Sequence, residues 1–211
     1  MGRAAVRGGS RDGLRRWPQH RDPASDECWS PGWVVDWARG VLGGIDLDPA
    51  SCEEAQRTVR AARWCGVEDD GLALPWAGRV WLNPPWGAGQ KPLWVEKLLS
   101  ERDVTAWAAL MSLDLTSAAV RRLACAAEVV MVPTTKLRYA RPEGSFTVGW
   151  FASAVFFGGP GLDADAARVP PREFGGRWVE ASFSDVSLQQ RLWAPGRGAA
   201  VPAGRRGEGG S

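Results

Sequence analysis

Two prolines stand between an asparagine and a tryptophan in the stretch RVWLNPPWGAG, residues 79–89. Each proline fixes φ and removes a backbone N–H, so the stretch presents carbonyl acceptors in one rigid shape. Together with the side-chain oxygen of Asn83, such acceptors suit a planar amine that has two hydrogens to donate. Trp86 adds a flat face on which a heterocycle can stack. These residue types favour a site that holds an aromatic amine while the amine attacks an electrophile. A rigid turn with Trp86 packed in the core is the structural alternative.

A second polar cluster lies in IDLDPAS, residues 45–51. Asp46 and Asp48 alternate with apolar residues, so both carboxylates are expected to point the same way near the end of a strand. Ligands of open α/β sheets bind outside the carboxyl ends of the strands, where a carboxylate can accept a hydrogen bond from a ribose hydroxyl or an ammonium group. A helix cap followed by a turn would explain the same residues without a ligand. No glycine-rich phosphate loop is present, which argues against a dinucleotide or a triphosphate.

Short apolar runs alternate with helical patterns around these motifs. A helix is expected from Ser30 and Pro31 to Val41, with Ser30 as its cap and Pro31 in its first position. Further helices are expected at 52–62, 90–101 and 116–127. Strands are expected within 45–51, 79–83, 104–113, 128–133, 136–140 and 150–159. This alternation predicts an α/β fold with a parallel or mostly parallel sheet that helices cover on both faces.

The composition is that of an ordinary globular protein. The chain has 211 residues, of which 45% are hydrophobic and 24% charged, enough for one domain with a substantial core. No apolar run approaches the about 20 residues of a membrane helix, and the N-terminus lacks the apolar segment of a secretory signal. A cytoplasmic protein without a membrane partner is therefore expected.

The scarce histidine and scattered cysteines argue against several kinds of site. Four cysteines lie far apart without a C-x-x-C pair, and His20 is the one histidine. A zinc site and a catalytic triad are therefore not expected, nor is any other metal. Both ends of the chain are rich in Gly, Arg and Pro. We expect disordered basic tails at 1–26 and 194–211 and a folded domain at 27–193.

Four motifs, in order along the chain, resemble those of phage-type (Dam-like) DNA N-6-adenine methyltransferases. The family pattern runs W-x-T-P, D-x-D-x-A, D-G-L-x-x-x-W and NPPY/W. The similar stretches here are CWSP at 28–31, IDLDPAS at 45–51, DDGLALPW at 69–76 and VWLNPPWG at 80–87. A later stretch, YARPEGSFTVGWFASAVFFGG, is similar to the family's closing strands. The resemblance covers about residues 27–160, and the ordered set is far more specific than NPPW alone.

The resemblance implies a single Rossmann-like domain that uses S-adenosylmethionine to methylate the N-6 amine of adenine in DNA, in a bacterial or phage-infected cell. The residues that match the family's catalytic loop are Asn83, Pro84, Pro85 and Trp86. The residues that match its cofactor-binding positions are Trp29, Ser30, Pro31, Asp46, Asp48, Pro49, Ala50 and Asp70.

A duplex base must leave the stack to reach such a site, so DNA phosphates have to be held nearby. Candidates for phosphate contacts are Arg121, Arg122, Lys136, Arg138 and Arg141, with a solvated charged face as the alternative. Two other functions fit the sequence. One is methylation of another amine: an RNA base, cytosine N-4 or protein glutamine. The other is a catalytically silent nucleic-acid-binding module. The recognition sequence and oligomeric state stay open.

Overall fold

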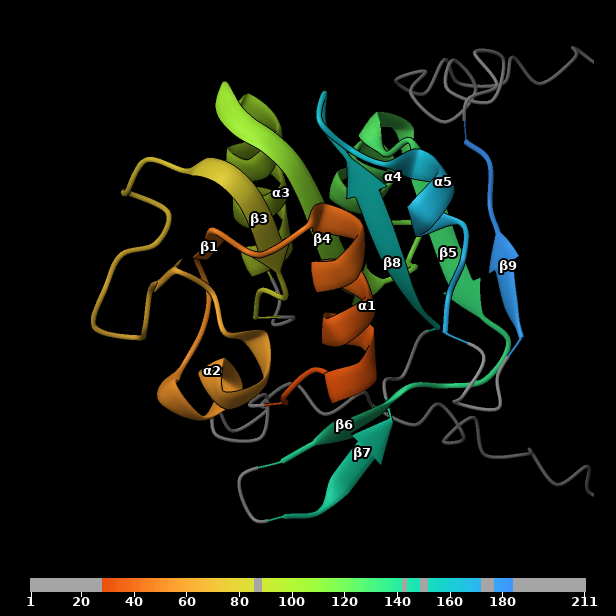
Figure 1. The fold of residues 1–211 in the computed structure, drawn as a ribbon, viewed down its shortest axis with the longest axis horizontal. Helices are drawn as coiled ribbons and strands as arrows, with labels where there is room; N and C mark the ends of the chain where they lie inside the picture. Colours follow the sequence, from red (N-terminus) through yellow and green to blue (C-terminus); the bar gives the residue numbers. More distant parts are fainter. Residues whose placement is uncertain (1–27, 86–88, 142–143, 149–151, 172–176, 184–211) are drawn as a thin grey trace, which may run out of the picture.

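Seven strands form one sheet at the centre of the protein (Figure 1). In spatial order they are β2 (Arg63–Trp64), β1 (Leu47–Asp48), β3 (Ala77–Leu82), β4 (Asp103–Ser112), β8 (Ser153–Gly158), β5 (Val129–Pro133) and β9 (Trp178–Glu180). The structure, a computed structural model, describes residues 28–85, 89–141, 144–148, 152–171 and 177–183. The predicted tails lie outside these residues.

The sheet is mixed, with most strands running one way. β1 pairs in parallel with β2 and β3, and β3 pairs in parallel with β4. β8 lies antiparallel between β4 and β5, so β5 has the direction of β4, while β9 runs against β5. The predicted mostly parallel α/β sheet is confirmed. The sequence predicted the position of β8 but not its direction, because a strand buried on both faces reads the same either way.

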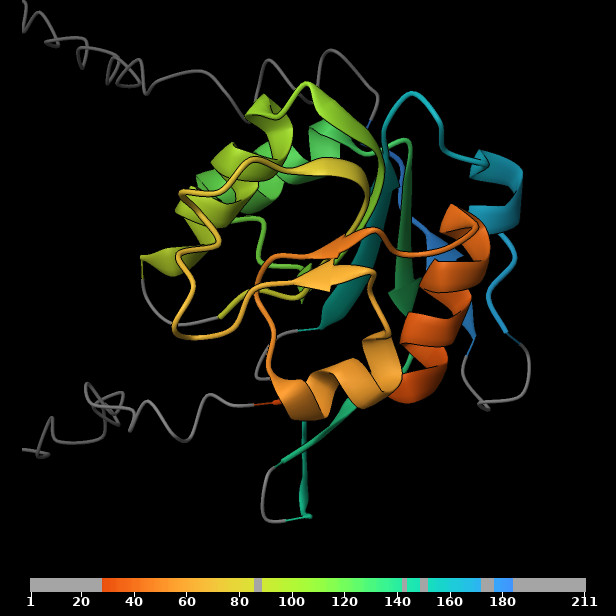
Figure 2. The same cartoon turned by 60° about the vertical axis from the view of Figure 1, so that its left-hand side comes forward.

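Helices cover both faces of the sheet (Figure 2). The helices α1 (Gly32–Leu42), α2 (Glu53–Val59) and α5 (Ala164–Ala167) contribute to one apolar core. The helices α3 (Gln90–Ser100) and α4 (Ala118–Ala126) contribute to the other. Alternate residues of β4 divide between the two cores: Ala108 and Leu110 face α1, whereas Ala109 and Met111 face α3. A central strand buried in this way requires the uninterrupted apolar run that the sequence shows.

The first helix differs from its prediction at one end. α1 begins at Gly32 with Pro31 as its N-cap, and no side chain caps it. The predicted cap by Ser30 is therefore wrong, because Ser30 lies one residue before the capping position. The C-terminal end is as expected. Gly43 adopts a left-handed φ of 70°, which ends the helix at the glycine pair that follows it.

A small hairpin stands apart from the main sheet. Its strands are β6 (Arg138–Ala140) and β7 (Phe146–Val148), which pair antiparallel. An isolated backbone bridge joins Trp29 to Ala140. Figures 1 and 2 show the hairpin at the same end of the protein as the start of α1. The sequence predicted an extended segment at β6, and β7 lies in the stretch that is similar to the family's closing strands. It gave no sign of β2 or β9, which are two and three residues long.

A close backbone contact joins the loop after β2 to the turn after β1. A Cβ on Gly71 would lie 2.1 Å from the carbonyl oxygen of Pro49. The indole N–H of Trp76, which is buried, donates to the carbonyl oxygen of Gly71 at 2.8 Å. The D-G-L-x-x-x-W pattern thus has a structural reason: glycine permits the contact, and tryptophan anchors the loop.

We predict that Gly71→Ala destabilises the protein by about 1–3 kcal/mol, because the new methyl group must displace backbone. Gly40→Ala is the matched control, since a Cβ there meets nothing within 4 Å. Gly40 lies inside α1, so its replacement should stabilise by about 0.5–1 kcal/mol. Urea unfolding of both variants measures these changes. Equal stability of wild type and Gly71→Ala would contradict the contact.

Candidate ligand-binding site at the carboxyl edge of the sheet

The strand order reverses between β1 and β3. From β1 the chain passes through α2 to the edge strand β2, whereas from β3 it passes through α3 to β4 on the other side. Because α2 and α3 cover opposite faces, their connections diverge at this point. In open α/β sheets, such a switch point leaves a crevice outside the carboxyl ends of the strands, and ligands bind there. Asp48 ends β1 and Asn83 follows β3, so two predicted site residues flank the switch point.

Asp48 is a buried carboxylate. Its exposed fraction is 2%, and its oxygens accept hydrogen bonds from the Gln56 side chain at 2.9 Å and the Ala50 amide at 3.4 Å. Burial raises the pKa of Asp48 from 3.8 to about 6, although bonds from Ser51, Ala50 and Gln56 oppose the shift. No salt bridge to Asp48 occurs among the residues that the structure describes. Within the described residues, the Asp48 carboxylate therefore has no ion-pair partner that would stabilise its ionised form.

Asp46 has different surroundings, although it lies two residues before Asp48. Its Oδ2 accepts from the backbone N–H and Nε of Arg79, both at 2.8 Å, and its Oδ1 accepts from Nη2 at 2.7 Å. The Arg79 side chain holds the pKa of Asp46 at about 2. The carboxylate thus ties the start of β1 to β3, which is a structural use of a residue that the sequence suggested for a cofactor.

Asn83 joins two of the sequence motifs. Its Nδ2 donates to the Ser30 hydroxyl at 3.0 Å, across 53 positions of the chain. This bond holds the Asn83 amide against the segment that precedes α1. Ser30 in turn follows Trp29, which exchanges two backbone hydrogen bonds with Ala140 at 2.8 and 3.2 Å. The CWSP and NPPW motifs, separate in sequence, therefore meet at the carboxyl edge of the sheet.

The prolines after Asn83 differ in exposure: Pro84 is buried and Pro85 is exposed. Trp86, the predicted stacking residue, lies outside the described residues, so its role stays a prediction. Pro49 is buried beside Asp48 and Ala50 is half-buried, both within the turn that meets Gly71.

Asp70 is exposed in the loop after β2. Its Oδ1 accepts from the backbone N–H groups of Leu72 at 3.1 Å and Ala73 at 3.3 Å. It thereby caps a turn within the D-G-L motif. No described contact links it to Asp48 or Asn83.

Four polar residues that the sequence did not single out lie at the same edge. Ser112 ends β4 and pairs across the strands with Ser153, the first residue of β8, and both side chains are buried. Lys91 donates to the Ser112 hydroxyl at 2.8 Å, and Tyr139 donates to the Ser153 hydroxyl at 2.6 Å. Burial lowers the pKa of the Lys91 ammonium and raises the pKa of the Tyr139 phenol. The sequence signal for Ser112 and Ser153 was a serine at the end of one apolar run, β4, and at the start of another, β8.

The predicted phosphate contacts divide into two groups. Arg121 donates to the backbone carbonyls of Leu115 and Thr116, both at 2.8 Å, and Arg122 pairs with Glu96 of α3. These two arginines therefore have partners within the fold. Lys136 and Arg138 are exposed at β6, and Arg141, which follows β6, is half-buried.

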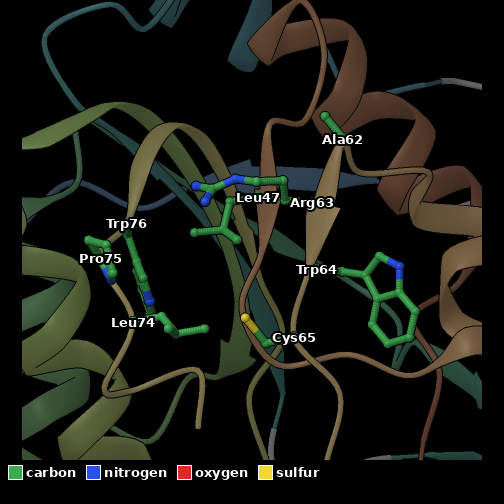
Figure 3. Close-up of a pocket in the computed structure, with 8 residues that line it drawn as sticks. All are labelled: Leu47, Ala62, Arg63, Trp64, Cys65, Leu74, Pro75 and Trp76. Carbon is green, nitrogen blue, oxygen red and sulfur yellow. The ribbon is translucent and has the colours of Figure 1, made fainter. Parts of the chain in front are cut away.

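One cavity lies away from these residues. A cavity of about 340 Å³ opens between the β1–β2 edge and residues 74–76, with walls that include Leu47, Cys65 and Trp76 (Figure 3). Leu47 faces the α3 side of the sheet, whereas Asp48 faces the α1 side, because adjacent strand residues point in opposite directions. The cavity and the Asp48 carboxylate therefore lie on different sides of β1.

Comparison with known protein families gives no matching family model, and comparison with curated proteins gives no match. Among the described residues, no three His, Cys, Asp or Glu side chains come together as metal ligands would. Within the same ranges, no helix is both long enough and apolar enough to cross a bilayer.

The burial of Asp48 predicts a pH-dependent difference between wild type and Asp48→Asn. The folded protein binds the proton of Asp48 more tightly than the unfolded chain, so stability from this group falls as pH rises from 3.8 to about 6. The free energy of unfolding of Asp48→Asn, minus that of wild type, should therefore increase by about 3 kcal/mol between about pH 4 and pH 7. Urea unfolding measures it. Asp103→Asn, at the exposed start of β4, is the matched control for the loss of a carboxylate. A constant difference for Asp48→Asn would refute the desolvation.

Proposed function

We propose that this chain is an S-adenosylmethionine-dependent methyltransferase that acts on the N-6 amine of adenine in DNA. The observation that carries the proposal is the position of the Asn-Pro-Pro stretch. Asn83 follows β3 at the switch point and contacts Ser30, and Asp48 ends the neighbouring strand β1. The resemblance of the four ordered motifs to DNA adenine methyltransferases supports the same reading.

The residues at the switch point fit a cationic nucleoside. Asp48 is a buried carboxylate with no salt-bridge partner among the described residues, so a bound cation would offset the cost of its ionisation. Asp48, the turn at 49–51 and the segment at 29–31 would hold S-adenosylmethionine. When bound, it supplies an electrophilic methyl group on a sulfonium. Asp46 is bound by Arg79, so we assign Asp46 a structural role in the proposed site.

Asn83 would position the attacking amine. Its Nδ2 donates to Ser30, and in the proposed complex its Oδ1 accepts a hydrogen bond from the exocyclic –NH₂ of adenine. The amine nitrogen gains positive charge as it attacks, and the bond to a fixed oxygen becomes stronger in the transition state than in the ground state. No strong base is needed before attack. Toward the adenine, Ser30 acts as a positioning residue, because it reaches the attacking amine through Asn83.

The first prediction from this function concerns the cofactor. Purified protein should bind S-adenosylmethionine in calorimetry, and affinity should rise between about pH 5 and pH 7 as Asp48 ionises. Asp48→Asn should bind more weakly and lose this pH dependence, whereas Asp103→Asn should behave as wild type. Absence of binding by correctly folded wild-type protein would refute the methyltransferase function.

The second prediction concerns catalysis. Asn83→Ala should lower kcat for methylation of adenine in plasmid DNA by roughly 10²–10³, the range seen when one preorganised polar group is removed. Asn83→Asp keeps an oxygen acceptor and should retain more activity. Cofactor affinity should barely change in either variant. Single-turnover assays with mass spectrometry of the nucleosides measure the rate and identify the methylated base. Full activity of Asn83→Ala would exclude Asn83 from catalysis, and methylcytosine as the product would change the substrate.

A further inference from the structure

The β6–β7 hairpin exposes apolar side chains that no core explains. Phe146 is 61% exposed and Val148 is 49% exposed. The register pairs Arg138 with Val148 and Ala140 with Phe146, so these four residues share one face of the hairpin. Tyr139, which lies between Arg138 and Ala140, points the other way and is buried in the core. The hairpin thus turns one side inward and presents an apolar side to the solvent.

A cation is held against this apolar face. The Arg138 guanidinium lies 5.0 Å from the centroid of the Phe146 ring. Lys136 is exposed just before β6. Over residues 134–148 the sequence carries Lys136, Arg138 and Arg141 against Glu143, a net charge of +2. An exposed aromatic ring among cations is complementary to a nucleic acid, which offers phosphates and apolar base and sugar faces together.

The hairpin is attached directly to the candidate site. The Tyr139 hydroxyl donates to Ser153, which pairs with Ser112 at the end of β4. On the other side, Ala140 exchanges backbone hydrogen bonds with Trp29, the neighbour of Ser30. An isolated two-stranded hairpin is marginally stable in water, so these anchors fix where its outer face lies. A ligand on that face would lie next to the carboxyl edge of the sheet.

We propose that the outer face of the β6–β7 hairpin docks on the DNA duplex beside the target adenine. Arg138 contacts a backbone phosphate, and Phe146 with Val148 packs against the sugars and bases that the displaced adenine leaves exposed. This proposal rests on the proposed function and extends it, because it assigns the hairpin as the element that holds DNA against the Asn83 site. Apolar side chains between cationic ones are suited to a locally unstacked duplex.

The test uses the full chain and a fluorescein-labelled 30-base-pair duplex of mixed sequence, with binding followed by anisotropy at several salt concentrations. Phe146→Ala should weaken binding at least about fivefold, the lower limit for loss of one stacking ring. Its effect should not depend on salt. Arg138→Ala should instead reduce the slope of log K against log salt by about 1.

Two control variants carry matched changes at other places. Arg102→Ala removes an exposed arginine just before β4, at the amino end of that strand, and Val169→Ala removes a side chain that is 70% exposed near α5. Both should bind DNA as wild type does. Circular dichroism melting should show all four variants folded, because the changed side chains are exposed. A variant that melts early is replaced by Phe146→Ser or Arg138→Gln.

The outcomes separate this proposal from the function on which it rests. If wild type binds DNA and the hairpin variants bind equally well, the hairpin proposal is overturned and the methyltransferase proposal stands. If wild type binds S-adenosylmethionine but no DNA, the hairpin proposal also fails. If wild type sediments as a dimer and Phe146→Ala as a monomer, the hairpin proposal is overturned, because a second copy of the chain then occupies the outer face of the hairpin. DNA binding that depends on Phe146, without cofactor binding, would support the hairpin surface and refute the methyltransferase function.

Discussion

The contact between Asp46 and Arg79 determines how β1 meets β3, and the candidate site depends on that meeting. β1 is two residues long and shares a single register pair with β3, Leu47 with Val80. The bidentate pair adds three hydrogen bonds from Arg79 to the Asp46 carboxylate. Gly78 has a φ of 77° and leaves no space for a Cβ, which would lie 2.5 Å from Asp46. Because the pair is about one-third exposed, we assign its importance to register rather than to net stability.

That register sets the relative positions of the two strand ends. One residue after Leu47 comes Asp48, and three residues after Val80 comes Asn83. A slip by one residue would turn each of these side chains to the other face of the sheet. The buried Asp48 carboxylate is costly for folding at neutral pH, since burial disfavours its charge. In the proposed function, a cationic ligand bound at the switch point would offset this cost.

The candidate site and the hairpin share one support. Segment 28–31 contacts Asn83 through Ser30 and the hairpin through Trp29, so a single stretch before α1 connects both. The hairpin and the Asn83 side chain are therefore connected through the same segment. In the proposed reaction, DNA held on the hairpin would have its displaced base aligned with Asn83. The gain in rate from this alignment would be a proximity effect.

The sequence by itself determined the α/β class, the approximate limits of the longer elements, and the polar residues Asp48 at the end of β1 and Asn83 just after β3. These features follow from local periodicity and from residues such as Gly43 and Pro84, whose backbone effects do not depend on distant parts of the chain. Only the tertiary structure decided the direction of β8, the short strands β2 and β9, and the different fates of Asp46 and Asp48. The two carboxylates look equivalent in IDLDPAS, but Arg79, 33 residues from Asp46, neutralises one of them. The meeting of Ser30 with Asn83 likewise joins residues 53 positions apart. Such contacts arise from the packing of whole elements, and no local pattern encodes them.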